Sequence, residues 1–133
     1  MKPTENKTKA RWFSQRLHRE VTMARWGSFG QPVLLFPTAG GDCEEIERFL
    51  MIKALAPLID GGKIKLYSCD SVAGQAMVTQ EGSPGHRQWV LNQFHQYIRH
   101  ELVPAVRKDC GVDNIELFSA GASIGALDRK SVV

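Results

Sequence analysis

No apolar run in this chain approaches the roughly 18 residues that a membrane-spanning helix requires. The first residues are charged and lack the apolar stretch of a secretory signal. We therefore expect a soluble, cytoplasmic protein that does not associate with membranes. No internal repeat or low-complexity segment is present either, so the 133 residues predict one globular domain.

Cysteine is scarce, and its three copies, Cys43, Cys69 and Cys110, lie far apart. An odd number of cysteines without a C-x-x-C motif indicates neither a disulfide framework nor a zinc site. We expect three buried or half-buried thiols, no metal and no cofactor.

Excess positive charge is confined to the start of the chain. The formal net charge is +3, and the first 16 residues contribute +4 from five basic residues and Glu5, so the remainder carries −1. Residues 1–11 are therefore expected to form a disordered basic N-terminus. No basic motif interleaved with aromatics is present, so we expect no nucleic-acid partner.

Apolar patterning predicts alternating strands and helices. Strands are expected at residues 17–24, 33–36, 63–69 and 115–120, helices at 43–55 and 83–108, and a loop at 70–85. This order favours a mostly parallel sheet with right-handed crossovers, in which 33–36 and 115–119 are parallel neighbours.

Helix boundaries are also marked in the sequence. Asp42 is a candidate N-cap for the first helix, and Ser83 followed by Pro84 for the second. Pro104 should kink the second helix and Gly111 should end it.

The last predicted strand leads into residues 121–125, which read G-A-S-I-G. This fits G-x-S-x-G, the motif of a nucleophile elbow, in which a serine occupies a tight turn between a strand and a helix. Gly121 and Gly125 would be required because any side chain there would collide with neighbouring backbone. The alternative is a glycine-rich turn that merely ends a strand.

A second loop of small residues follows the strand at 33–36 and reads P-T-A-G-G over residues 37–41. It resembles the oxyanion loop of α/β-hydrolases, and the elbow follows two strands later, as in that fold. From about Trp12 to Gly125 the chain resembles the front half of an esterase of the esterase D / antigen 85-like group. The resemblance implies an α/β fold: the N-terminal half of an alpha/beta-hydrolase, a mostly parallel sheet with flanking helices in a three-layer sandwich, incomplete after the elbow.

The domain would then span residues 12–127. Residues 128–133 resemble the translation of a sequencing adapter and are expected to be a non-native tail of a gene fragment; the alternative is a natural polar C-terminus.

The resemblance also implies the chemistry, which is carboxylic ester hydrolysis of a small-molecule substrate through an acyl-enzyme on the nucleophile Ser123. The backbone N–H of Ile124 would bind the oxyanion, together with the N–H of Ala39 or, alternatively, of Thr38. Gly40 and Gly41 complete this loop. The chain departs from the family pattern at residues 37 and 38, where Pro-Thr replaces the usual His-Gly.

All four histidines precede Ser123, whereas the fold's order is serine, acid, histidine. His18, His95 and His100 are expected on exposed or packed positions, and His86 could line a substrate pocket. Asp42 and Asp70 could contact substrate, although capping and turn formation are favoured. We expect this chain alone to be inactive and poorly stable. The competing hypothesis is a non-catalytic binding or interaction module.

Overall fold

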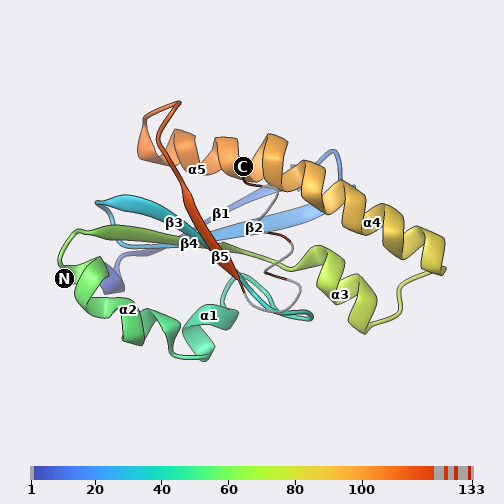
Figure 1. Ribbon diagram of the computed structural model, residues 1–133, viewed down its shortest axis with the longest axis horizontal. Coiled ribbons are helices and arrows are strands. Elements are labelled where there is room, and N and C mark those ends of the chain that lie inside the picture. The colour runs from blue at the N-terminus through green and yellow to red at the C-terminus, as the bar shows by residue number, and fades with distance from the viewer. Residues whose placement is uncertain (1, 122–124, 126–127, 129–131, 133) are drawn as a thin grey trace.

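In the computed structural model, a five-stranded mixed sheet carries helices on both faces (Figure 1). The structure describes residues 2–121, 125, 128 and 132. The strands are β1 (Lys7–Ser14), β2 (Arg19–Trp26), β3 (Gln31–Phe36), β4 (Ile64–Cys69) and β5 (Phe118–Gly121). The helices are η1 (Pro3–Glu5, 3₁₀), α1 (Glu45–Arg48), α2 (Met51–Asp60), α3 (Val72–Val78), α4 (Pro84–Tyr97), η2 (Ile98–Leu102, a π-helical segment) and α5 (Val103–Cys110).

The strand order across the sheet is β1-β2-β4-β3-β5. β2 runs antiparallel to both of its neighbours, and β3 runs parallel to β4 and to β5. The predicted pairing of the strands around residues 33–36 and 115–119 is confirmed, with Val33 opposite Phe118 and Phe36 opposite Gly121. The carboxyl ends of β3 and β5 therefore meet at one edge of the sheet, where both predicted site loops begin.

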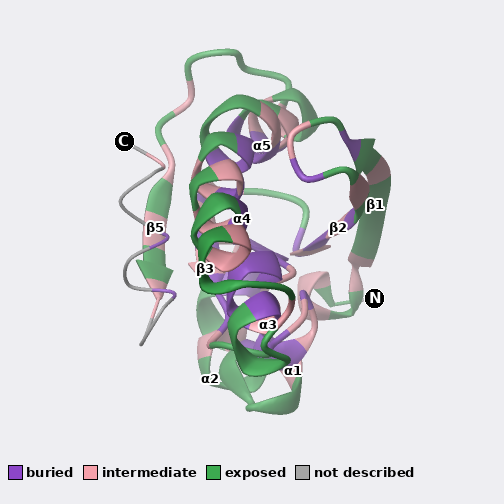
Figure 2. Cartoon of the chain, turned by 90° about the vertical axis from the view of Figure 1, so that its right-hand side faces the viewer, coloured by how far each residue is buried: buried purple, intermediate pink, exposed green. Residues whose placement is uncertain are grey.

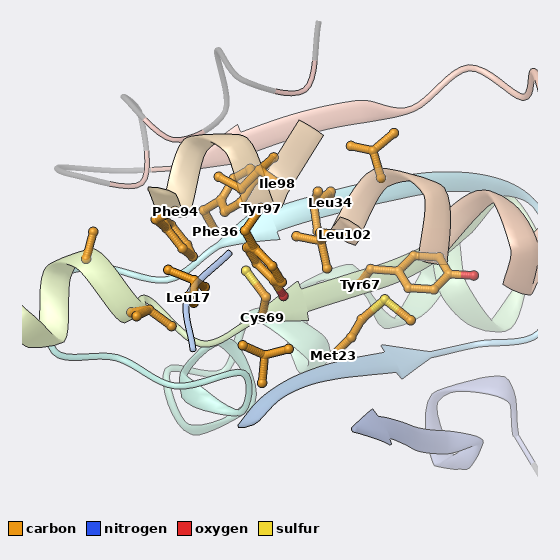
Figure 3. Packing of buried hydrophobic residues seen from close by; sticks show 14 of the residues in the cluster. Leu17, Met23, Leu34, Phe36, Tyr67, Cys69, Phe94, Tyr97, Ile98 and Leu102 are labelled. Atoms are coloured by element: carbon orange, nitrogen blue, oxygen red, sulfur yellow. The ribbon is translucent and has the colours of Figure 1, made fainter. Parts of the chain in front are cut away.

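Two apolar clusters make this a three-layer structure. The larger cluster lies between the sheet and the layer of α3, α4, η2 and α5, and includes Leu34, Tyr67 and Tyr97 (Figure 3). The smaller lies between the other face and helices α1 and α2, and includes Trp26 and Leu66. Neighbouring residues on one strand belong to different clusters, because successive side chains of a strand point to opposite faces of the sheet.

The expectation of a disordered stretch over residues 1–11 was wrong. Residues from Lys7 onward form β1, which pairs with β2 along its whole length. The positive charge of Lys7 is neutralised by Glu44 and Glu47, and Lys9 Nζ lies 2.6 Å from Glu44. The segment appeared unstructured in sequence because it is polar, and the carboxylates that pair with its lysines lie more than 30 residues further along the chain.

The expected strand at 17–24 begins later, because Leu17 and His18 form the turn before β2 and His18 has a φ of 54°. The expected helix at 43–55 is two helices, α1 and α2, separated at Leu50, whose φ is 65°. The expected loop at 70–85 contains α3. The last strand begins only at Phe118.

The long helix behaves as its capping signals predict. Ser83 Oγ accepts a hydrogen bond from the His86 N–H at 3.0 Å, and Gly111 ends the helix with a φ of 73°. Between these ends the π-helical segment η2 directly precedes α5, which contains Pro104 near its start. Proline has no N–H and its ring crowds the carbonyl four residues earlier, so a wider turn accommodates it. Among the described residues, no helix combines the length and apolarity needed to cross a membrane.

Candidate active site

Two glycines are in close contact at the end of β5. A Cβ atom on Gly121 would lie 2.4 Å from the carbonyl carbon of Gly125, and one on Gly125 would lie 2.8 Å from the carbonyl oxygen of Pro37. Real Cβ atoms essentially never approach backbone this closely, so neither position has room for a side chain. Ala122, Ser123 and Ile124, which separate the two glycines in sequence, lie outside the described residues.

The loop after β3 is fixed by a buried carboxylate. Glu45 of α1 is 7% exposed, and its Oε2 accepts the Thr38 N–H at 2.8 Å while its Oε1 accepts the Thr38 hydroxyl at 2.7 Å. Buried carboxylates need such partners because desolvation otherwise destabilises their charge. Thr38 therefore uses both its backbone and its side-chain donor on one residue.

The far end of the same loop is fixed by the start of α3. The Gly41 carbonyl accepts the Ser71 N–H at 3.0 Å and the Gln75 side-chain amide at 2.9 Å. Gly74 allows α3 to approach the loop, because a Cβ there would lie 2.8 Å from the Ala39 Cα. The segment between Phe36 and α1 is thus held at both ends.

Ala39 and Gly40 lie between these two attachments and are exposed. The Thr38 N–H is bonded to Glu45 and the Gly41 N–H to the Thr38 carbonyl at 3.0 Å. In the described part of the chain, by contrast, the N–H groups of Ala39 and Gly40 have no acceptor. Two backbone donors on the exposed part of this loop therefore lack an acceptor among the described residues.

The two aspartates considered as substrate contacts serve the backbone instead. Asp42 Oδ1 accepts the Glu44 N–H at 2.9 Å, and Asp70 Oδ1 accepts the Cys43 N–H at 2.9 Å. Burial raises the pKa of Asp70. Both residues shape the turn before α1, as expected, but the prediction of Asp42 as the N-cap was wrong, because the N-cap position is Glu44.

An apolar cavity of about 360 Å³ opens next to this loop. It is lined by Leu35, Phe36, Thr38, Glu45, Ile46, Phe49, Met51, Ala120 and Gly121. Its walls come from β3, β5 and the α1–α2 region, so it lies at the same sheet edge as the glycine pair.

Two of the histidines have partners on the α3–α4 side of the molecule. His86 Nε2 lies 2.7 Å from Glu81 Oε2, and its ring stacks on Trp89 at 6.0 Å. This bond lowers the pKa of Glu81. His95 Nε2 lies 3.2 Å from Asp128 Oδ1, and burial raises the pKa of Asp128 to about 6.

Glu45 is the site residue that sequence reasoning missed. Glu44, Glu45 and Glu47 are equally suited to a helix N-terminus, and the sequence offers no signal that distinguishes Glu45 from the other two. In the structure Glu44 and Glu47 pair with the two lysines of β1, Lys7 and Lys9, whereas Glu45 binds Thr38 of the loop.

The strand order, the antiparallel β2 and the tight glycine contact after β5 together define a partial α/β-hydrolase fold. Solved structures with this fold are similar to the chain. A ferulic acid esterase matches with a TM-score of 0.66 and 14% identity over 93% of this chain and 52% of its own. The enterobactin esterase FES from Shigella flexneri matches with a TM-score of 0.62 and 16% identity, over 98% of this chain and 35% of its own.

MPT51 (FbpC1) of Mycobacterium tuberculosis matches with a TM-score of 0.60 and 16% identity, over 90% of this chain and 44% of its own. The chain thus spans about half or less of the length of these structures. No family model and no curated protein matches the sequence. These similarities show the fold, which is the N-terminal part of an α/β-hydrolase, as the sequence motifs predict.

Proposed function

We propose that the protein to which this chain belongs is a serine esterase that hydrolyses small-molecule carboxylic esters through an acyl-enzyme on Ser123. The observation that carries the proposal is the contact of Gly121 and Gly125 with each other and with the Pro37 carbonyl. That contact brings the two ends of the G-x-S-x-G motif against the loop after β3. A nucleophile elbow requires this proximity, because the oxyanion donors come from the elbow and from that loop.

The proposed reaction uses two backbone donors. The Ser123 hydroxyl attacks the ester carbonyl carbon and gives its proton to a histidine base, and negative charge develops on the carbonyl oxygen. The N–H groups of Ile124 and Ala39 would bind that oxygen, each stabilising the transition state by about 3–4 kcal/mol. The alcohol then leaves with the proton from the histidine. Water, deprotonated by the same histidine, attacks the acyl-enzyme, and the carboxylic acid leaves as the proton returns to the Ser123 oxygen.

The base and its acid partner are proposed to follow Leu127 in the whole protein. In this fold the acid and histidine come after the serine in the chain. The pairing of His86 with Glu81 and of His95 with Asp128 supports the view that these upstream histidines serve other contacts.

The test is covalent labelling of the full-length gene product with a fluorophosphonate probe. Labelling is expected on Ser123 and should disappear in Ser123→Ala. Ser28→Ala, at an exposed turn before β3, is the matched control and should label like the wild type. Labelling that survives Ser123→Ala, or a reading frame that supplies no acid and histidine after Leu127, would overturn the proposal in favour of a non-catalytic module.

A further inference from the structure

We infer that Glu45 is a positioning residue of the oxyanion hole, because its buried carboxylate binds the Thr38 N–H and thereby makes Ala39 rather than Thr38 the donor to the substrate oxyanion. The inference rests on the proposed function, since it concerns the same site. Glu45 itself touches neither the substrate nor the nucleophile; it acts through the loop.

The first argument is competition between neighbouring donors. An oxyanion donor has to be free before charge develops, since a donor already bonded within the protein would have to break that bond during the reaction. The Thr38 N–H is bonded to Glu45 Oε2 at 2.8 Å. Ala39, the next residue, keeps an N–H without an acceptor in the described residues and lies on the exposed part of the loop.

The second argument is the space built for this contact. A Cβ on Gly41 would lie 2.5 Å from Glu45 Oε1 and 2.9 Å from the Pro37 Cβ, so only glycine lets the carboxylate reach the loop. The Thr38 hydroxyl, at 2.7 Å, occupies the second carboxylate oxygen. Residues from the loop and from α1 are therefore shaped around the same carboxylate.

The third argument concerns charge. A free carboxylate beside a developing oxyanion would raise the energy of the transition state through repulsion. Here both oxygens of Glu45 accept hydrogen bonds from Thr38, and charge-assisted bonds of this kind are roughly twice as strong as neutral ones. A glutamine at this position would still accept from the Thr38 N–H through its one carbonyl oxygen, so the conservative variant should preserve the arrangement.

The kinetic test compares variants of the full-length protein in ester hydrolysis. Glu45→Ala should lower kcat about 100-fold, the cost of one misplaced oxyanion donor, with KM changed by less than about threefold. Glu45→Gln should restore kcat to within about fivefold of the wild type, since it retains one acceptor. Glu47→Ala is the matched control on the same helix: it loses its bonds to Lys7 and Trp26, away from the loop, and should leave kcat unchanged.

Two further variants keep the test independent of whether Glu45→Ala folds. Thr38→Val removes only the hydroxyl and should lower kcat about tenfold, whereas Thr38→Ser should retain full activity. Amide hydrogen exchange gives a separate readout: the Thr38 N–H should exchange slowly in the wild type and rapidly in Glu45→Ala.

The outcomes separate the two proposals. Wild-type kcat in Glu45→Ala, with labelling of Ser123 intact, overturns the positioning role and leaves the esterase standing. Rapid exchange of the Thr38 N–H in the wild type also overturns it. Absence of any Ser123-dependent turnover in the wild type overturns both, even if Thr38 exchanges slowly.

Discussion

The indole N–H of Trp12 donates a hydrogen bond to the carboxylate of Glu101 at 3.0 Å, joining β1 to the π-helical segment of the long helix. The same carboxylate accepts from the Ser14 hydroxyl at 2.9 Å and from Arg16 at 3.2 Å. One side chain that is mostly shielded from solvent thus fastens the first hairpin to the helical layer.

Glu101→Ala should therefore lower the free energy of unfolding by about 2 kcal/mol, because it leaves the donors of Trp12 and Ser14 without their acceptor. Urea unfolding followed by circular dichroism measures the change. Glu20→Ala is the control, since its pair with Arg11 is solvent-exposed and should contribute less than about 1 kcal/mol. Equal effects of the two substitutions would contradict the fastening role.

Gly121→Ala should prevent the glycine contact from forming and should abolish labelling by the fluorophosphonate probe. The added Cβ would meet the Gly125 backbone at 2.4 Å, which cannot be relieved by a side-chain rotation. Gly111→Ala is the matched control, since its φ of 73° is strained for alanine but its Cβ would enter open space. It should cost about 1 kcal/mol and leave labelling intact.

Stability should depend on pH through Asp128. Burial raises its pKa from 3.8 to about 6, so the folded state binds a proton more tightly than the unfolded state does. This stabilisation is fully present below about pH 4 and is lost as the pH rises through about 6. In Asp128→Asn the free energy of unfolding should fall less between about pH 4 and pH 6 than it does in the wild type. If the free energy of unfolding of the variant falls with pH as steeply as that of the wild type, groups other than Asp128 cause the fall.

The three thiols should differ in reactivity. Burial raises the pKa of Cys43 to about 12 and raises that of Cys69 as well, which keeps both thiols protonated. Cys110 is half-buried and lies 3.4 Å from the Tyr67 hydroxyl. In native protein at pH 8, an aromatic disulfide reagent should modify one thiol rapidly, and Cys110→Ser should remove that phase. Rapid modification that persists in Cys110→Ser would contradict the prediction that Cys110 is the most reactive of the three thiols.

Self-association of the 133-residue chain should proceed through β5. Among the described strands β5 pairs only with β3 and lies at an edge of the sheet (Figure 2). Phe118, its first residue, is 59% exposed. Open strand edges with apolar side chains promote pairing between molecules. Phe118→Lys should shift the chain toward monomer in sedimentation velocity. Phe29→Lys, in the turn before β3 and 75% exposed, should change the distribution less.

Patterns within short stretches of sequence were sufficient to predict much of the fold. The apolar run before Pro37 and the alternation before Gly121 were sufficient to predict neighbouring parallel strands, and Ser83 and Gly111 mark helix ends through contacts within a few residues. These features depend on short-range geometry, which a sequence displays directly.

What escaped prediction depends on partners distant in sequence. Residues 7–11 pair with β2, and Lys7 in this strand forms an ion pair with Glu47 of α1, 40 residues further along the chain. The break between α1 and α2 lies at Leu50, whose φ of 65° nothing in the sequence indicates. The role of Glu45 is likewise a tertiary contact with Thr38. Of the predicted site, the glycines and the loop could be located, whereas Ser123 and Ile124 lie outside the described residues and their roles stay predictions.

The position of β3 in the sheet sets the order in which a nascent chain can complete this structure. Leu34 pairs on one side with Tyr67 and on the other with Ser119, so both neighbours of β3 are synthesised after it. Contacts of such long sequence separation form slowly. While the ribosome makes residues 70–117, β3 has one edge without its final partner. That edge is closed only when residues 118–121 have been made and β5 pairs with β3.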